Sequence, residues 1–302
     1  KKITGNVGFE DKHYNVGFVI SFLVNKTVYH QLAMMSKNMG FEIKNLHMIS
    51  MKNEYYFPVY GITNQTKNYF AYISVREGNV YSKMKLEKKG VGLRSSKIPR
   101  NVMDRFDTYL KYLMDTIIER QKITLDDLFG IPYDTEVLVR ESVLNGKSEY
   151  FQTAQIKSID AYKAGSDAPA QKLHRLWEQV FAPKYGEAPE LPYVALKVST
   201  QLTSARTLKR WVASIEDREL AERLDRYLRM EQRNNLGTIY VPKMSIGFGS
   251  LPKEIVSVID INKQLMNVMS PFYLTLESYG FYLRNPNNTT MVHTHYKRVD
   301  NI

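Results

Sequence analysis

The stretch that decides the fold is residues 66–99, TKNYFAYISVREGNVYSKMKLEKKGVGLRSSKIP. Two runs rich in β-branched and aromatic residues, at about 69–75 and 80–87, are separated by a Gly-Asn turn signal, and a similar run at about 55–63 precedes them. This pattern predicts an antiparallel meander of three strands. Pro99 suits the first position of a helix, so we expect the chain to change there from strands to helices.

Beyond Pro99, apolar residues recur at helical spacing. The longest stripe predicts a helix from Pro99 with apolar positions at Val102, Phe106, Tyr109, Leu110, Leu113 and Ile117. Further helices are expected beyond it at 135–145, 169–181, 204–234 and 252–279, and one more is expected before the meander at 25–40. Residues 137–146, VLVRESVLNG, also fit a strand entering an Asn-Gly hairpin, and Ser214 with Asp217 fits a restart within 204–234. The predicted fold is α+β, an antiparallel β-meander followed by a mostly α-helical region.

The chain is basic. Its 302 residues carry a formal net charge of +11, which favours a polyanionic partner, either nucleic acid or an acidic membrane surface. Seven basic residues and one acid fall between positions 82 and 100, and this region reads as a hairpin rather than as a membrane-surface helix. Because cysteine is absent, disulfides, thiolate chemistry and cysteine zinc sites are excluded. No run of about 18 apolar residues predicts a membrane span.

The hairpin carries candidate phosphate-binding residues. Lys67 and Tyr69 stand two positions apart where a strand is expected to begin, so we expect their side chains to share one face of the pleat. A guanidinium and two hydroxyls follow directly before the helix, a mixture that commonly holds phosphate oxygens. The candidate nucleic-acid-binding residues of this stretch are Lys67, Tyr69, Lys88, Lys89, Arg94, Ser95, Ser96 and Lys97.

A second basic cluster lies at the start of the helix expected at 204–234. It has no acid nearby, whereas the other charges of this helix alternate in sign and are interpreted as surface pairs. The cluster is a candidate phosphate site, and the alternative is a solvated helix end. Its members are Arg206, Lys209 and Arg210, together with the upstream Lys197 and Thr200.

No motif in the chain predicts catalysis. His293 and His295 have no carboxylate near them in sequence, so we assign no metal to them. Asp126 and Asp127 are interpreted as part of a helix cap that Thr124 begins. No P-loop, dinucleotide fingerprint, nucleophile elbow or zincin motif occurs. The aromatic residues of the meander are expected to pack a core, and they are Tyr55, Phe57, Phe70, Tyr72 and Tyr81.

Several landmarks occur in an order that resembles one protein family. They are Lys67-Asn68-Tyr69, then Gly90, Ser95-Ser96 and Pro99, and finally residues 250–280, SLPKEIVSVIDINKQLMNVMSPFYLTLESYG. The first is similar to the Lys-x-Tyr motif near the end of the palm of family B DNA polymerases. The second set resembles the opening of the first thumb helix in members from tailed bacteriophages, and the third resembles their last thumb segment. The likeness covers about residues 51–280.

The resemblance implies that residues 1–98 are the late part of the palm and that 99–302 are the thumb. It also implies that Lys67 lies in the minor groove of the primer–template duplex and Tyr69 near a primer phosphate. Minor-groove acceptors are nearly the same for every correct base pair, so a lysine donor there does not read sequence. The basic residues of the thumb would hold the duplex by its phosphates.

One departure separates the chain from a complete polymerase. The family's metal-binding aspartates lie in Asp-x-x-Ser-Leu-Tyr-Pro and Tyr-Gly-Asp-Thr-Asp-Ser motifs, and neither occurs here. The resemblance therefore implies no catalytic residue in this chain. The Mg²⁺ of the assembled polymerase would be bound outside it, by a subunit or N-terminal segment that carries the exonuclease, the fingers and the catalytic palm.

The first residue of the sequence is Lys1 rather than methionine. We expect either a fragment or the C-terminal subunit of a polymerase encoded in two pieces, acting in DNA replication. Its expected location is the cytoplasm, which would be that of the host cell for a phage protein. The alternative is a stand-alone, non-catalytic nucleic-acid-binding protein.

Overall fold

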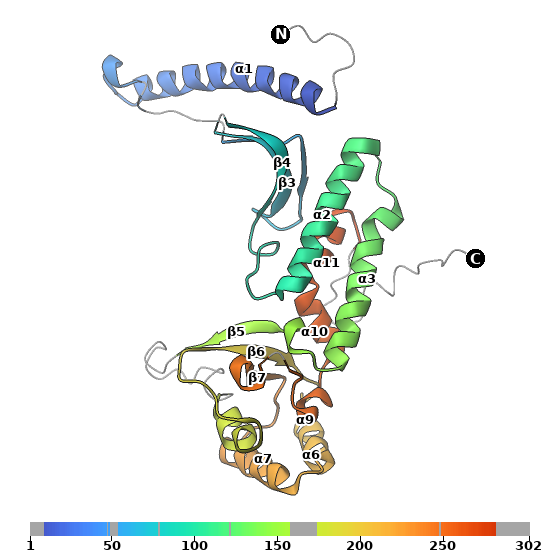
Figure 1. Cartoon of the computed structure of the whole chain (residues 1–302). Helices are drawn as coiled ribbons and strands as arrows, with labels where there is room; N and C mark the ends of the chain where they lie inside the picture. Colours follow the sequence, from blue (N-terminus) through green and yellow to red (C-terminus); the bar gives the residue numbers. More distant parts are fainter. Residues whose placement is uncertain are drawn as a thin grey trace, which may run out of the picture. The chain divides into compact units, whose positions relative to one another are not determined.

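The computed structural model contains helices and antiparallel sheets, which confirms the predicted α+β class (Figure 1). It describes residues 9–46, 48, 54–77, 79–120, 122–157, 174–247 and 249–281. The chain divides into two compact units, the first of Lys1–Arg94 and Leu110–Ile123, the second of Ser95–Tyr109 and Thr124–Ile302. Helix α2 (Arg100–Arg120) therefore gives its first half to the second unit and its second half to the first.

The first unit starts with the long helix α1 (Phe9–Asn38). The helix begins well before Asn25, so the predicted start was wrong, while Gly40, with φ +85°, follows its end as predicted. Large apolar side chains of α1 such as Ile20 and Leu23 are exposed. No helix in the described ranges has both the length and the hydropathy needed to cross a membrane.

The predicted meander is confirmed. Its strands are β1 (Tyr55–Tyr56), β2 (Val59–Ile62), β3 (Tyr69–Arg76) and β4 (Asn79–Lys89). β3 lies in the middle and pairs antiparallel with β1 and β2 on one side and with β4 on the other. The first predicted strand is interrupted at Phe57 and Pro58, because proline has no N–H to donate to the ladder.

The two faces of the meander differ. Phe70 and Tyr72 are buried, and the Tyr72 hydroxyl donates hydrogen bonds to Asp115 Oδ1 (2.8 Å) and to the Lys111 carbonyl (3.3 Å) in the second half of α2. The predicted aromatic core is therefore confirmed for Phe70 and Tyr72. It is wrong for the remaining three aromatic residues, which are only half-buried: Tyr55, Phe57 and Tyr81.

In the second unit, a hydrogen bond from the first half of α2 compensates for a proline inside α3 (Leu125–Leu144). Pro132 lies inside α3, and because proline lacks an N–H, the Leu128 carbonyl one turn earlier has no helical donor. The hydroxyl of Tyr109, on α2, donates to this carbonyl at 2.9 Å, and the Tyr109 side chain is fully buried.

The ends of α3 follow the sequence signals. Thr124 and Asp127 form a reciprocal capping box, which confirms the predicted cap. Asn145 and Gly146 follow the last turn, with φ +66° at Gly146. The helix interpretation of residues 137–146 is therefore confirmed, and the hairpin alternative is wrong.

We predict that Tyr109→Phe lowers the stability of the chain. The substitution keeps the ring but leaves the buried Leu128 carbonyl without a donor, which costs about 1–3 kcal/mol. The change is measured as a lower midpoint of thermal or urea unfolding. Tyr60→Phe is the matched control, since Tyr60 is 59% exposed and its hydroxyl is solvated. Equal midpoints for the two variants would contradict the role of this hydrogen bond.

The second unit also contains a sheet that the sequence did not predict. Its strands are β5 (Gln152–Ile156), β6 (Tyr193–Ser199) and β7 (Thr238–Pro242), which pair antiparallel in that order. The expectation that strands give way to helices after Pro99 was therefore incomplete. β5 is short and polar, and the strands pair over long separations in sequence, so no local hairpin signal marks them.

The other helices of the second unit are short. They are η4, a π-helical turn (Trp177–Phe181), α5 (Ala182–Tyr185), α6 (Ala205–Ser214), α7 (Arg218–Met230), α8 (Lys243–Ile246), α9 (Lys253–Val256), α10 (Ile261–Val268) and α11 (Ser270–Ser278). A single 3₁₀ turn, η2 (Ser148–Tyr150), also lies in the second unit, and another, η1 (Ile43–Asn45), lies in the first unit. Asp217 caps α7, so the predicted restart is confirmed. The first part of the helix expected at 169–181 lies outside the described residues.

Candidate nucleic-acid interface

In the first unit, the side chain of Asn68 joins two turns. Asn68 is buried, and its Oδ1 accepts a hydrogen bond from the backbone N–H of Gly92 at 3.2 Å. Its Nδ2 donates to Gln65 Oε1 and to the Thr66 carbonyl, both at 3.3 Å. Gly90 has φ +103°, and a Cβ there would lie 1.8 Å from Asn68 Oδ1. Only glycine fits at position 90, and the turn before β3 is therefore fixed to the turn after β4.

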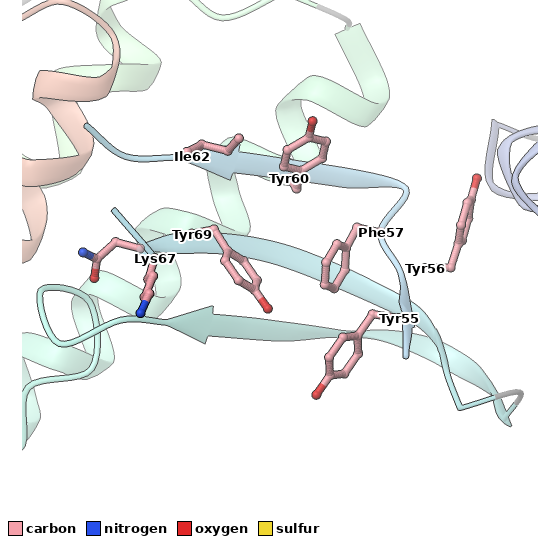
Figure 2. Close-up of a pocket in the computed structure, with 8 residues that line it drawn as sticks. Tyr55, Tyr56, Phe57, Tyr60, Ile62, Lys67 and Tyr69 are labelled. Carbon is pink, nitrogen blue, oxygen red and sulfur yellow. The ribbon is translucent and has the colours of Figure 1, made fainter. Parts of the chain in front are cut away.

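Lys67 and Tyr69 are placed differently from the prediction. β3 begins at Tyr69, and Lys67 lies in the preceding turn with φ +63°, so the two residues do not share the pleat of one strand. They nevertheless line one groove, as Figure 2 shows. Lys67 is exposed and Tyr69 is half-buried.

The basic residues at the end of β4 point to opposite faces of the meander. Lys89 pairs in register with Tyr69, and Lys88 pairs with Phe70, and directly opposed residues lie on the same face. Lys89 therefore lies on the Tyr69 face and Lys88 on the other. Arg94 is exposed, and its N–H donates to the Gly90 carbonyl at 3.1 Å.

In the second unit, a short segment leads into α2. The Ser95 hydroxyl accepts from the Lys97 N–H at 3.4 Å, and the Lys97 carbonyl accepts from the β5 residue Thr153 at 3.0 Å. Ser96 lines a groove of about 510 Å³ whose other residues include Arg100, Lys243, Asp104 and Glu149. Because acids and bases share this lining, the groove alone does not favour an anion.

Three lysines from distant parts of the sequence form a cluster, which we call the lysine cluster: Lys97, Lys197 and Lys263. Lys197 is half-buried on β6. Burial, and then the charges of Lys97 and Lys263, lower the pKa of Lys197. None of the three forms an ion pair within the part of the chain that the structure describes. The predicted Lys97 and Lys197 are thus brought together.

Lys263 was not among the predicted residues. It lies in the first turn of α10, where Asp260 accepts a hydrogen bond from its backbone N–H at 3.0 Å. A single lysine in an amphipathic helix carries no binding signal of its own. Only the packing of α10 against β6 places Lys263 beside Lys197.

Thr200 does not fit the predicted role. It is completely buried, and its hydroxyl donates to the Leu236 carbonyl. Its N–H donates to the Gly237 carbonyl at 3.2 Å. The side chain has no access to a phosphate, so the prediction that Thr200 contacts one was wrong, and the residue instead fixes the end of β6.

The cluster on α6 is exposed, as predicted. Arg206, Lys209 and Arg210 form no ion pair among the described residues, and no interaction there joins them to Lys197. α7 contrasts with this arrangement, because two of its four arginines pair with acids one turn away: Arg223 with Glu219 (3.1 Å) and Arg229 with Asp225 (2.7 Å). The predicted contrast between the unpaired start and the paired remainder of 204–234 is confirmed.

Acidic side chains of the described residues have structural roles. Glu254 accepts hydrogen bonds from Lys184 (3.0 Å) and Tyr185 (2.6 Å), and the buried Glu136 accepts one from Tyr273 (2.7 Å). No group of three or more side chains of the types that ligate metals occurs in the described ranges, so these residues do not fit a two-metal site. His293 and His295 lie outside the described residues.

We predict that Lys197→Gln stabilises the DNA-free chain at pH 7. The folded pKa of Lys197 is lowered below its unfolded value of about 10.4, so folding disfavours its charged form. This penalty is complete below the folded pKa and vanishes as the pH rises above the unfolded pKa. Calorimetry should show a rise of about 1–3 °C at pH 7 that shrinks toward pH 10.5.

Lys122→Gln is the control for this prediction. Lys122 is exposed, and its replacement removes the same charge without relieving the lysine cluster. An equal effect of the two substitutions would mean that neither burial nor the charges of Lys97 and Lys263 disfavour the charged form of Lys197.

The family model described as "Divergent Family B DNA polymerase" matches residues 1–296. Comparison with curated proteins finds no significant match.

Proposed function

The chain belongs to the divergent family B DNA polymerases, and we propose that it is the late palm and thumb of such an enzyme, binding the primer–template duplex. The lysine cluster is the observation that carries this proposal. Lys197 is half-buried beside two like charges, which destabilises the free chain. A row of phosphates removes that repulsion.

Binding through phosphates suits a polymerase, because a polymerase must bind DNA of any sequence. Lysines that neutralise phosphates release condensed counterions, so binding is strong at low salt and independent of sequence. We assign Lys97, Lys197 and Lys263 to this role in the thumb, together with the exposed start of α6. In the palm, we assign Lys67 to the minor groove and Tyr69 to a primer phosphate.

Catalysis, in this proposal, requires a second polypeptide or segment. The described residues hold no cluster of metal ligands, and the sequence lacks the family's two aspartate motifs. Two-metal phosphoryl transfer needs carboxylates that hold both ions. We assign these carboxylates, and the Mg²⁺ that they bind, to the partner.

An exposed face of α1 supports such a partner. Val16, Val19, Ile20 and Leu23 are 43%, 54%, 55% and 59% exposed, and their i, i+3, i+4, i+7 spacing places them on one side of the helix. Contiguous apolar surface of this kind marks protein interfaces. This surface favours a subunit over a stand-alone nucleic-acid-binding protein.

Duplex binding tests the proposal. Replacing Lys97, Lys197 and Lys263 together by Gln should weaken binding of a primer–template duplex about equally for all sequences. The slope of log K against log salt concentration should fall by about 2 to 3, because each lost phosphate contact contributes about 0.9. Fluorescence anisotropy of a labelled duplex measures both quantities.

The matched control for duplex binding is a triple Gln variant of three exposed lysines, Lys111, Lys122 and Lys147. It lowers the net charge equally. If both triple variants lose the same affinity and the same slope, net charge rather than the lysine cluster binds the duplex, and the proposed site is wrong.

Primer extension tests the division of roles. With Mg²⁺ and all four nucleotides, the chain alone should not extend a primer, and extension should appear when a palm-bearing partner is added. Gel analysis of a labelled primer measures the product. Ile20→Glu should weaken this activation by the partner, whereas Lys26→Glu, on the same helix, serves as a charge-changing control. Extension by the chain alone would refute the assignment.

A further inference from the structure

The meander carries an aromatic groove of about 360 Å³ (Figure 2). The rings of Tyr55 and Phe57 are stacked, with centroids 5.5 Å apart and planes at 15°, and the rings of Phe57 and Tyr69 are 5.7 Å apart. Three aromatic rings therefore form a continuous row. The volume lies within the range of about 300–1,000 Å³ that is typical of ligand sites.

The groove lies on the face of the meander opposite to the one that packs on α2. Ile62 pairs in register with Tyr69, and Tyr60 pairs with Ala71, so both share the Tyr69 face. Tyr60 is 59% exposed and Ile62 is 64% exposed. The three rings of the row are half-buried and line the groove, whereas Phe70 and Tyr72 use the other face for the core.

Positive charge borders this row. Lys67 lines the groove at the Tyr69 end, and Lys89 lies on the same face beside Tyr69. At the other end, the Arg76 guanidinium lies 5.5 Å from the centre of the Tyr55 ring. Acids also act at that end, because Glu54, and to a smaller extent Glu87, raises the pKa of the Tyr55 hydroxyl. A ligand with anionic groups would therefore place them at the Lys67 end.

We propose that the aromatic groove binds unpaired nucleobases of single-stranded DNA, with Lys67 and Lys89 holding the adjoining phosphates. Aromatic rings bordered by cations are the usual means of binding single strands, because every base has a face that stacks. Bases within a duplex are stacked on each other and do not reach such a groove. A protein segment would not need the lysines at its rim.

This inference goes beyond the proposed function, which concerns duplex phosphates. It gives the polymerase a second DNA contact, for a strand that has left the duplex. Lys67 and Tyr69 take part in both contacts, but the duplex test changes only the lysine cluster and the single-strand test changes only Tyr55 and Phe57, so the two tests are independent.

The experiment measures the affinity of the full-length chain for a labelled 12-nucleotide oligo(dT) and for a blunt duplex by fluorescence anisotropy. The double variant Tyr55→Leu/Phe57→Leu removes two stacking rings but stays apolar. We expect about tenfold weaker binding of the single strand and less than a twofold change for the duplex. Tyr81→Leu is the control, because Tyr81 lies outside the groove lining and is also a half-buried aromatic residue of the meander.

A second measurement uses the unaltered chain, so it does not depend on the stability of a variant. An oligo(dT) that carries 5-iodouracil is photocrosslinked, and the attachment is located by mass spectrometry. We expect it at Tyr55, Phe57 or Tyr69. Crosslinks elsewhere, or equal single-strand affinity of the double variant and the unaltered chain, would overturn the proposal.

Two outcomes separate this inference from its rivals. If the groove variant keeps its single-strand affinity but loses activation by a palm-bearing partner, the groove binds protein and the inference is wrong. If the oligonucleotide crosslinks to the groove while the lysine variant keeps its duplex affinity and salt slope, the inference stands and the proposed duplex site fails.

Discussion

The hydrogen bonds of Asn68 are the constraint on which the candidate interface of the first unit depends. One side chain holds the turn that presents Lys67 and, through the N–H of Gly92, the turn that leads to Arg94. A buried amide that lost these partners would leave polar groups unsatisfied, which costs about 1–3 kcal/mol. This hydrogen-bonded arrangement of Asn68 also requires glycine at position 90. The residue between Lys67 and Tyr69 thus sets the position of its neighbours.

The second unit holds its charges by the opposite means. Among the described residues no acid pairs with the lysine cluster, and burial together with the charges of Lys97 and Lys263 disfavours the charged form of Lys197. The neighbouring Leu196 and Leu265 are almost fully buried. In the proposed function, the phosphates of DNA would offset this electrostatic cost. The two units therefore position their candidate binding residues differently. In the first unit, hydrogen bonds of Asn68 fix the turns, and in the second, tertiary packing brings like charges together.

The features that could be predicted from the sequence are those set by residues close together along the chain. Short-range alternation located β3 and β4, and caps at Thr124 and Asp217 located two helix starts. The sheet of β5, β6 and β7 was missed, because its pairing joins segments far apart in sequence and its strands are short. For the same reason the sequence did not indicate Lys263, whose position beside Lys197 is purely tertiary. Thr200 was wrongly predicted to contact a phosphate, because its position near basic residues in the sequence does not show that its side chain is buried.

The aromatic residues of the meander show how far composition alone can mislead. Tyrosine and phenylalanine in strands usually pack a core, and Phe70 and Tyr72 do so. The interruption at Pro58 ends the regular ladder beside Tyr55 and Phe57, and their rings join Tyr69 in a row that lines the groove instead. A core would bury these rings against aliphatic side chains, whereas here cations border them at both ends. Stacking on a planar ligand is an interaction that the geometry of such a row favours.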